Sequence, residues 1–228
     1  MKYPGAELDS FDKASIWRKY VFWNIKDFIK GLTLEVGAGI GSFTSNYKSL
    51  SSKITLSEVD ADNLDFIKKK FKKDNFNFTS DYTKNISTNF DTIMYLNVLE
   101  HIKEDDTEIL DAFEKLNPNG CLIILVPAHN KLYSKFDKAV GHFRRYDINF
   151  FKNIKLQKSK LVKLCYLDSA GYFLYYLNKV FFKEEVYPSK IKILIWDKVF
   201  TPLTFFLDKI LMYKFGKNIL YVVKKLET

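Results

Sequence analysis

The sequence is short of several features, and each shortage excludes a class of protein. Only two cysteines occur in 228 residues, Cys121 and Cys165, which excludes a disulfide scaffold and predicts a reducing, cytoplasmic location. The longest stretch without a charged side chain, 116–130, has 15 residues and two prolines, so we expect no transmembrane helix. The segment from Met1 to Gly5 does not begin an apolar run, so we expect no secretory signal. No group of His, Cys and acidic residues has the spacing of metal ligands, so we predict no metal site.

The positive charge is concentrated in the last third of the chain. The net charge is +9, and residues 151–228 hold 15 lysines against 6 acidic residues, whereas residues 1–150 hold 21 basic and 21 acidic residues. This basic segment is also rich in Phe and Tyr, a combination that suits a phosphate-bearing surface such as lipid headgroups or nucleic acid. Lysines that serve only solubility would explain the same composition. Both interpretations stay open.

The middle of the chain alternates between strand-like and helical patterns. Apolar runs that suit strands occur at 32–36, 54–59, 76–79, 92–96 and 122–126. Between them, apolar residues at three- and four-residue spacing predict helices at 62–71 and 105–116. The Asn-Pro-Asn-Gly segment at 117–120 predicts a turn before the fifth strand. Such alternation is typical of βαβ units and predicts a parallel sheet covered by helices on both faces.

The pattern changes on both sides of this region. Residues 11–29 carry apolar side chains at helical spacing and predict one helix ahead of the first strand. After a polar loop at 127–150, two further strand-like runs at 161–167 and 219–223 suggest a terminal antiparallel pair. The residues between these two runs predict a helical insertion.

The predicted insertion, residues 169–216, is amphipathic. Its Phe, Tyr and Leu residues alternate with lysines, so its apolar face fits a membrane interface, a cover over the sheet edge or a dimer seam. Ser189 is expected to cap one helix, and Thr201 another that has Pro202 at its first position.

A glycine-rich segment follows the first predicted strand. It reads Glu35-Val36-Gly37-Ala38-Gly39-Ile40-Gly41-Ser42, and glycines here let the backbone approach a ligand in conformations that a Cβ atom would forbid. The nicotinamide-binding pattern Gly-x-Gly-x-x-Gly would need its third glycine at position 42, where Ser42 stands. The second strand ends in an acid, either Glu58, 19 residues after Gly39, or Asp60, and an acid there can accept hydrogen bonds from both hydroxyls of a ribose.

These residues resemble the motifs of the class I S-adenosyl-L-methionine (SAM)-dependent methyltransferases. The resemblance covers residues 30–128, and the segments 90–102 and 117–126 are similar to the family's fourth and fifth motifs. It implies an α/β fold with a seven-stranded Rossmann-like sheet in the order 3-2-1-4-5-7-6, whose last strand is antiparallel, with the helical insertion between the last two strands. The resemblance also implies SAM as the cofactor and S-adenosylhomocysteine as the product. In that pattern Glu58 holds the ribose, Asp81 faces the adenine and Asn97 lines the methionine end. The full set of cofactor contacts implied is Glu35, Gly37, Ala38, Gly39, Gly41, Glu58, Val59, Asp81, Tyr82 and Asn97.

A second resemblance lies after the fifth strand. The segment Gly141-His142-Phe143-Arg144-Arg145-Tyr146 is similar to the Gly-His-x-Arg-Arg-Tyr motif of a bacterial methyltransferase subgroup. Members of this subgroup are often encoded beside glycosyltransferases of cell-surface glycan or polyprenyl-phosphate pathways.

The histidines and the arginine pair supply candidate residues for the acceptor. His101, His129 and His142 follow the fourth or fifth strand, at the sheet edge where ligands bind, and His can act as a base near neutral pH. We therefore predict that these three are catalytic. An arginine pair suits bidentate recognition of carboxylate or phosphate, so the predicted acceptor-binding residues are Arg144, Arg145 and Tyr146.

The same side chains also have a purely structural interpretation. His101 would then cap a turn, His129 would be an ordinary exposed loop residue and His142 would fix the loop. The arginines would hold the loop through Asp137 and Asp147.

The sequence therefore predicts a SAM-dependent methyltransferase of a small-molecule, glycan or lipid-linked acceptor, with oxygen as the expected methylated atom. One alternative is a nucleic-acid methyltransferase, although no Asn/Asp-Pro-Pro-Tyr/Phe motif follows the fourth strand. Another is a non-catalytic SAM-binding protein at a membrane surface. Contact of the insertion with the cytoplasmic face of a membrane, and a homodimer, are further hypotheses. The predicted parts are a helical cap at 1–30, a core at 31–168 with a substrate loop at 127–150, the insertion at 169–216 and a terminal strand at 217–228.

Overall fold

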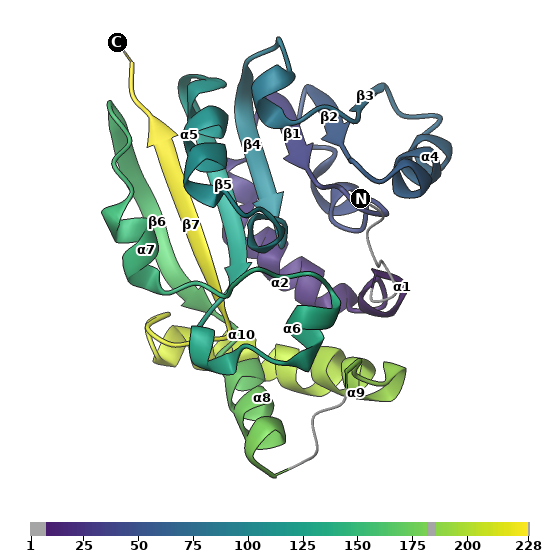
Figure 1. Cartoon of the computed structure of the whole chain (residues 1–228), viewed down its shortest axis with the longest axis vertical. Coiled ribbons are helices and arrows are strands. Elements are labelled where there is room, and N and C mark those ends of the chain that lie inside the picture. The colour runs from purple at the N-terminus through teal and green to yellow at the C-terminus, as the bar shows by residue number, and fades with distance from the viewer. Residues whose placement is uncertain (1–7, 182–185, 228) are drawn as a thin grey trace.

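A seven-stranded sheet forms the centre of the structure (Figure 1). The computed structural model describes residues 8–181 and 186–227, so residues 1–7 of the predicted cap, 182–185 of the predicted insertion and Thr228 lie outside the described residues. The strands are β1 (Leu32–Val36), β2 (Lys53–Ser57), β3 (Phe76–Thr79), β4 (Phe90–Leu96), β5 (Leu116–Pro127), β6 (Ser159–Leu167) and β7 (Asn218–Lys225).

The sheet has the order β3-β2-β1-β4-β5-β7-β6. β7 runs antiparallel to both β5 and β6, and all other neighbours are parallel. The structure therefore confirms the α/β fold, the predicted strand order and the antiparallel last strand.

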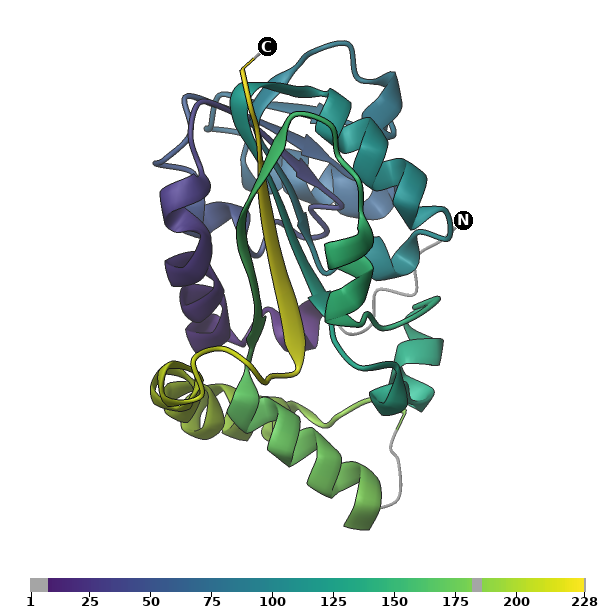
Figure 2. The same cartoon turned by 90° about the vertical axis from the view of Figure 1, so that its left-hand side faces the viewer.

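Helices cover both faces of the sheet because its strands are apolar on both sides (Figure 2). In β5, Ile123 belongs to the hydrophobic core beneath α2 (Ser15–Ile25), and the next residue, Ile124, to the core beneath α5 (Asp105–Glu114) and α7 (Ile148–Asn153). The other helices are α1 (Leu8–Phe11), α3 (Thr44–Tyr47), α4 (Ala61–Lys70), α6 (Lys135–Ala139), α8 (Ser169–Phe181), α9 (Lys190–Ile195) and α10 (Thr201–Ile210). Single 3-10 turns occur at Lys26–Phe28, Thr83–Asn85, Leu99–His101 and Asn130–Leu132.

The N-terminal helix is broken where the sequence predicts one continuous helix over 11–29. α1 ends at Phe11 and α2 begins only at Ser15. Ala14 precedes α2 and offers no side-chain cap; instead the carboxylate of Asp197, from the insertion, accepts the backbone N–H groups of Ile16 (3.2 Å) and Trp17 (2.8 Å). A distant side chain thus caps α2, and periodicity along the chain cannot reveal such a cap.

Of the two helix caps predicted in the insertion, the structure contains the one at Ser189 but not the one at Thr201. Ser189 caps α9 as predicted, since its hydroxyl accepts the backbone N–H of Lys192 at 3.3 Å. Thr201 is not a cap, because the helix continues from α9 through a π-helical turn at Trp196–Phe200 into α10. The wider turn lies just before Pro202, which has no N–H to donate to the preceding turn.

The predicted Asn-Pro-Asn-Gly turn is an irregularity inside β5. Phe90 of β4 pairs with Leu116, but Thr92 already pairs with Cys121, so the turn residues bulge between two paired positions. The backbone of Asn119 has φ +65°, a conformation typical of a tight turn.

The insertion lies at the carboxyl ends of β4 and β5, beside α6 (Figure 1). Asp208 of α10 is fully buried there, and its carboxylate accepts hydrogen bonds from the Tyr20 hydroxyl and from the backbone N–H groups of Asp168 and Ser169 (both 2.9 Å). Within the insertion, α10 is thus fastened to the start of α8, and it is also fastened to α2. Within the described residues, no helix combines the length and the apolarity needed to cross a bilayer.

Candidate active site

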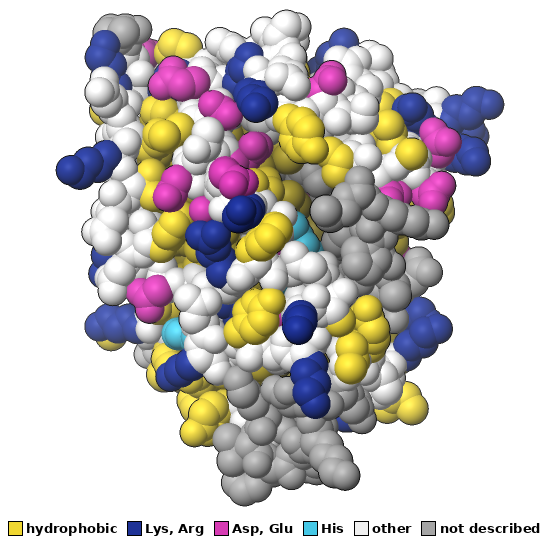
Figure 3. All heavy atoms as spheres, viewed as in Figure 1, with side chains coloured by type: hydrophobic (Ala, Val, Ile, Leu, Met, Phe, Trp, Pro, Cys, Tyr) yellow, Lys and Arg dark blue, Asp and Glu magenta, His cyan; other side chains and the backbone are white. Residues whose placement is uncertain are grey.

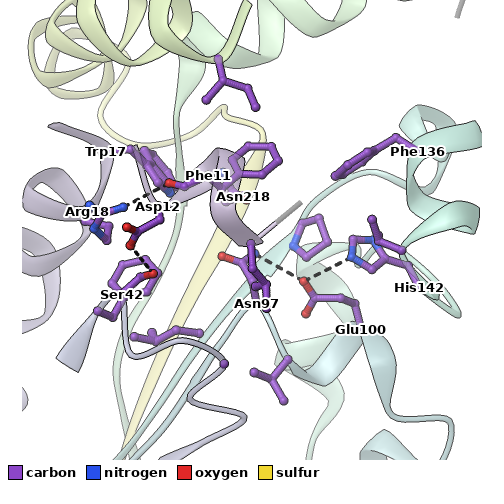
Figure 4. Close-up of a pocket in the computed structure, with 18 of the residues that line it drawn as sticks. Phe11, Asp12, Trp17, Arg18, Ser42, Asn97, Glu100, Phe136, His142 and Asn218 are labelled. Carbon is purple, nitrogen blue, oxygen red and sulfur yellow. Dashed lines mark hydrogen bonds and ion pairs between the residues drawn. The ribbon is translucent and has the colours of Figure 1, made fainter. Parts of the chain in front are cut away.

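A cavity of roughly 600 Å³ opens at the carboxyl ends of β1, β2, β4 and β5 (Figure 4). Its walls come from the glycine-rich loop, from α1 and α2, from the segment around α6 and from the insertion. This volume lies within the range of sites for small molecules and cofactors. The carboxyl edge of the parallel strands is also where open α/β sheets bind ligands.

The glycine-rich loop brings bare backbone to this cavity. Gly37 has φ +63° and Gly39 has φ +55°, a region that side chains with a Cβ atom rarely adopt. A Cβ atom at Gly37 would lie 2.7 Å from a methyl group of Val98, whereas at Gly39 the nearest atom, from Leu8, is 3.6 Å away. Gly37 is therefore required by both packing and conformation. Gly39 is required by conformation alone and leaves space beside its backbone.

Glu35 supports this loop from within the core. Its carboxylate accepts hydrogen bonds from the hydroxyls of Thr44 (2.6 Å) and Tyr47, and it also borders the cavity. Burial raises the pKa of Glu35 from 4.5 to about 7, although these two hydrogen bonds oppose the shift.

Glu58, rather than Asp60, is the acid that faces the cavity. One oxygen of the Glu58 carboxylate accepts the backbone N–H of Gly39 at 2.7 Å, and the other accepts that of Asp60 at 2.9 Å. Burial raises the pKa of Glu58, and the backbone hydrogen bonds partly offset the rise. The Asp60 side chain caps α4 instead, accepting the N–H groups of Asp62 and Asn63.

The predicted cofactor residues are only partly brought together. The cavity lining includes Glu35, Gly37, Ala38, Gly39, Glu58, Val59 and Asn97, all of them predicted contacts. Gly41 lies in the loop but not in the lining. Asp81 and Tyr82 follow β3 outside the lining; the Asp81 carboxylate accepts the Thr79 hydroxyl at 2.6 Å, and Tyr82 is 63% exposed.

A polar cluster follows β4 on the opposite wall of the cavity. Asn97, at φ +59°, directs its amide N–H toward Glu100 Oε1 at 3.4 Å, and His142 Nε2 lies 3.9 Å from the same oxygen (Figure 4). Burial raises the pKa of Glu100. Burial and the neighbouring His142 lower the pKa of His101 from 6.5 to about 4, so His101 is neutral at pH 7. Glu100 is not among the residues predicted from the sequence, although it adjoins His101 in the segment similar to the fourth motif.

His142 and Arg145 share one buried carboxylate. Asp137 Oδ1 accepts His142 Nδ1–H and Arg145 Nε–H, each at 2.9 Å, and Asp137 Oδ2 accepts the hydroxyl and the backbone N–H of Ser134. Burial opposes ionisation of Asp137, but the bonds from His142 and the charge of Arg145 outweigh it and hold its pKa well below the usual range. The loop anchor through Asp137 is therefore made by Arg145, and Arg145 also lines the cavity.

The other predicted acceptor residues lie away from the cavity. Arg144 bonds to Asp105 at 3.3 Å rather than to Asp147, and to the backbone carbonyl of Lys103. The buried Tyr146 hydroxyl lies within hydrogen-bond distance of the Asp105 carboxylate (2.7 Å) and of the Leu99 carbonyl oxygen (3.0 Å), so it holds the loop to the turn after β4 and to the start of α5.

His129 also lies outside the lining. It stacks on Tyr166 with ring centroids 5.1 Å apart, and its Nε2 is 3.0 Å from the carbonyl of Gly216. Its environment favours the structural interpretation of this histidine.

Three cavity-lining residues carry buried polar atoms without a hydrogen-bond partner. Among the described residues, such atoms include Glu100 Oε2, Arg145 Nη1 and Asn218 Nδ2. Buried polar groups are normally paired, so one acceptor and two donors are left for a ligand. Asn218, at the start of β7, could not be recognised from the sequence because its position depends on the antiparallel pairing of β7 with β5.

Residues 34–122 match the family model of a methyltransferase domain. No curated protein matches the chain. The matched segment runs from β1 to β5 and includes Glu35, the glycine-rich loop, Glu58 and the turn after β4.

Solved structures share the fold over nearly the whole chain. A candidate methyltransferase from Bacillus halodurans superposes with a TM-score of 0.61 at 12% identity, over 91% of this chain and 98% of that one. The N-methyltransferase NodS from Bradyrhizobium japonicum, in complex with S-adenosyl-L-homocysteine, has a TM-score of 0.59 at 12% identity, over 92% and 85% of the chains. The cyclase SpnF has a TM-score of 0.62 at 13% identity, over 94% and 81%. The neighbours thus include a protein named for a different reaction. The fold and the matched segment support SAM as the cofactor; the chain has the seven-stranded fold of the class I methyltransferases, and its residues 34–122 match a methyltransferase domain.

Proposed function

We propose that this protein is a SAM-dependent methyltransferase that uses the cavity at the carboxyl edge of the sheet. The observation that carries the proposal is the pair formed by Glu58 and Gly39, in which a carboxylate at the end of β2 is held against the open backbone of the glycine-rich loop. A carboxylate in this position accepts hydrogen bonds from the ribose hydroxyls of an adenosine. The methionine end then extends past Gly37 toward Asn97.

Titration calorimetry with SAM and with S-adenosylhomocysteine tests the proposal. We expect both ligands to bind the wild-type protein and Glu58→Ala to weaken both about 10- to 100-fold, the effect of losing charge-assisted hydrogen bonds. Asp65→Ala is the matched control, since this exposed carboxylate on α4 faces Lys68 at 3.8 Å and should leave affinity unchanged. Failure of the wild-type protein to bind either ligand would overturn the proposal.

The acceptor end of the cavity supports a small or slender acceptor with a polar group. The two unpartnered donors, Arg145 Nη1 and Asn218 Nδ2, would bind oxygen atoms of this molecule, whereas Phe11 and Phe136 supply apolar walls (Figure 4). We infer a hydroxyl as the methylated group. Extracts incubated with methyl-labelled SAM should yield a labelled product that carries the methyl group as a methyl ether, and a label released by mild base, as from a methyl ester, would refute the hydroxyl. Tight SAM binding without a labelled product would favour the non-catalytic alternative.

A lipid-linked acceptor is supported by the outer face of the insertion. Ile191, Ile195 and Val199, followed by Leu203, Phe206 and Ile210, repeat at three- or four-residue spacing and are all exposed, Phe206 to 66%. Every exposed charged side chain that the structure describes within the insertion is a lysine, because Asp197 and Asp208 are buried. Lysines also stand among hydrophobic side chains at this end of the molecule (Figure 3). Such a face suits the surface of an anionic membrane.

Flotation with anionic and neutral vesicles tests this part of the proposal. The wild-type protein should float with anionic vesicles, and Phe206→Ser should float several-fold less. Phe66→Ser, which removes an exposed aromatic side chain from α4 on another part of the surface, is the control. Absence of flotation of the wild-type protein would leave a water-soluble acceptor as the proposed substrate class.

A further inference from the structure

Three potential metal ligands meet at one wall of the cavity. Glu100 and His101 lie in the turn after β4, and His142 lies in the loop after α6. One ligand atom from each of the three residues lies within 4.8 Å of the others, and all three side chains border the cavity. They come from two segments 41 residues apart, which is why the spacing along the sequence predicts no metal site.

The Glu100 carboxylate lacks the partners that a buried anion needs. The residue is fully buried, and its Oε2 atom has no hydrogen-bond partner among the described residues. Its Oε1 atom receives a long contact of 3.4 Å from the Asn97 amide and lies 3.9 Å from His142 Nε2. An isolated buried carboxylate is strongly unfavourable, so a cation or a proton must compensate it. This unpartnered oxygen is the observation that points to a ligand.

His142 is oriented as a metal-binding histidine would be. Its Nδ1–H donates to Asp137, which is itself held by Arg145, so Nε2 is the ring nitrogen that faces Glu100 Oε1 and is placed to bind an ion. The 3.9 Å between these two atoms is too long for a hydrogen bond and leaves room for an ion. Metal-binding histidines usually donate their other N–H to a carboxylate or a backbone carbonyl.

His101 completes the arrangement. Its ring stands edge-on to that of His142, with centroids 4.6 Å apart, and it is hydrogen-bonded to the backbone of Gly141. Ligand atoms of a tetrahedral zinc site lie about 3.3 Å apart, given bonds of about 2.0–2.1 Å. Small side-chain rotations would therefore bring the three ligand atoms onto one ion.

We propose that Glu100, His101 and His142 bind a divalent transition-metal ion, with Zn²⁺ as the best match, at the acceptor end of the cavity. Two imidazoles and one carboxylate form the ligand set of catalytic zinc sites, which leave a fourth position open. Mg²⁺ and Ca²⁺, which prefer oxygen ligands, fit this set poorly.

The role of the ion follows from the open position and rests on the proposed function. An acceptor hydroxyl that binds there loses its proton to water more readily, because the ion stabilises the oxygen anion. That oxygen then forms the C–O bond to the methyl group while the S–CH₃ bond breaks and its electron pair remains on the sulfur of S-adenosylhomocysteine.

Zinc titration of the full chain, without SAM, tests the site. Protein freed of metal with a chelator should bind one Zn²⁺ per chain by calorimetry, and Mg²⁺ should give no comparable heat. We expect His142→Ala and His101→Ala each to weaken zinc binding at least 10-fold, and Asp137→Asn to weaken it about 10- to 100-fold, the usual effect of removing the carboxylate behind a ligating histidine. His129→Ala is the matched control, because it removes the one histidine that lies outside the cavity.

A second readout keeps the test independent of folding defects. Co²⁺ added to the wild-type protein should give the visible absorption of a low-symmetry, four- or five-coordinate site, and His142→Cys should shift this absorption by adding a thiolate ligand. The inference is overturned if the wild-type protein binds no zinc, or if His142→Ala and His129→Ala bind it equally. SAM titration of the same chelator-treated protein separates the two proposals: SAM binding without zinc binding refutes only the metal site, and zinc binding without SAM binding refutes the proposed function.

Discussion

Removing the carboxylate of Asp197 should lower the free energy of unfolding, because this side chain holds the junction between the insertion and α2. This side chain is 1% exposed and accepts the backbone N–H groups of Ile16 and Trp17, at the start of a helix whose own preceding residue offers no cap. In Asp197→Ala the buried N–H group of Trp17 loses its acceptor, which costs about 1–3 kcal/mol, and the partly buried N–H group of Ile16 loses its acceptor at a smaller cost. The lost interaction between the carboxylate and the helix dipole adds about 0.3–1 kcal/mol. With partial compensation by water, we expect the free energy of unfolding to fall by about 3 kcal/mol.

Urea unfolding followed by tryptophan fluorescence measures this change, because Trp17 and Trp196 pack together at the junction with ring centroids 5.5 Å apart. Asp197→Asn, which keeps one acceptor oxygen but no charge, should lose about half as much. Asp65→Ala removes an exposed carboxylate and should stay within about 0.5 kcal/mol of the wild-type protein. Equal stability of Asp197→Ala and Asp65→Ala would refute the assignment of Asp197 as the cap of α2.

Three further predictions follow from the walls of the cavity. Gly39→Ala should lower the stability by about 1 kcal/mol because of the positive φ at this position. Gly37→Ala should lower it clearly more, because its Cβ atom would also overlap Val98. Equal unfolding midpoints of the two variants would contradict this packing argument. Burial raises the pKa of Glu35 from 4.5, its ordinary value, to about 7 in the folded protein. Between these two pH values the folded protein holds more protons than the unfolded one. Its stability should therefore fall as the pH rises from 4.5 to 7. Glu35→Gln should remove this part of the fall, up to about 3 kcal/mol, when unfolding is compared across this pH range. Arg145→Ala should destabilise the protein by about 2–4 kcal/mol, because it leaves the buried Asp137 without the arginine cation. The Arg144 side chain is 38% exposed, so Arg144→Ala should change the stability by less than about 1 kcal/mol in the same assay.

The candidate site shows where sequence reasoning reached its limit. Glu58 and Gly39 could be predicted to face one ligand because each ends or follows a strand, and neighbouring parallel strands bring such residues to one edge. The hydrogen bond between them is seen only in the structure. The Arg144 and Arg145 pair could not be resolved. Adjacent residues point in different directions, and only the position of Asp137 relative to Asp105 decides which arginine turns inward.

The sequence by itself determined the α/β class and the place of the glycine-rich loop, because these depend on periodicity and on turn residues that are close along the chain. The strand order was implied by the resemblance of its motifs to those of a known family. Only the tertiary structure decided that His101 and His142 meet at Glu100 while His129 packs elsewhere, and that Asp197 caps a helix 180 residues away. Those contacts join segments far apart in the sequence. They depend on how the insertion and the loop after β5 pack against the sheet edge, and local patterns of residues carry no information on that packing.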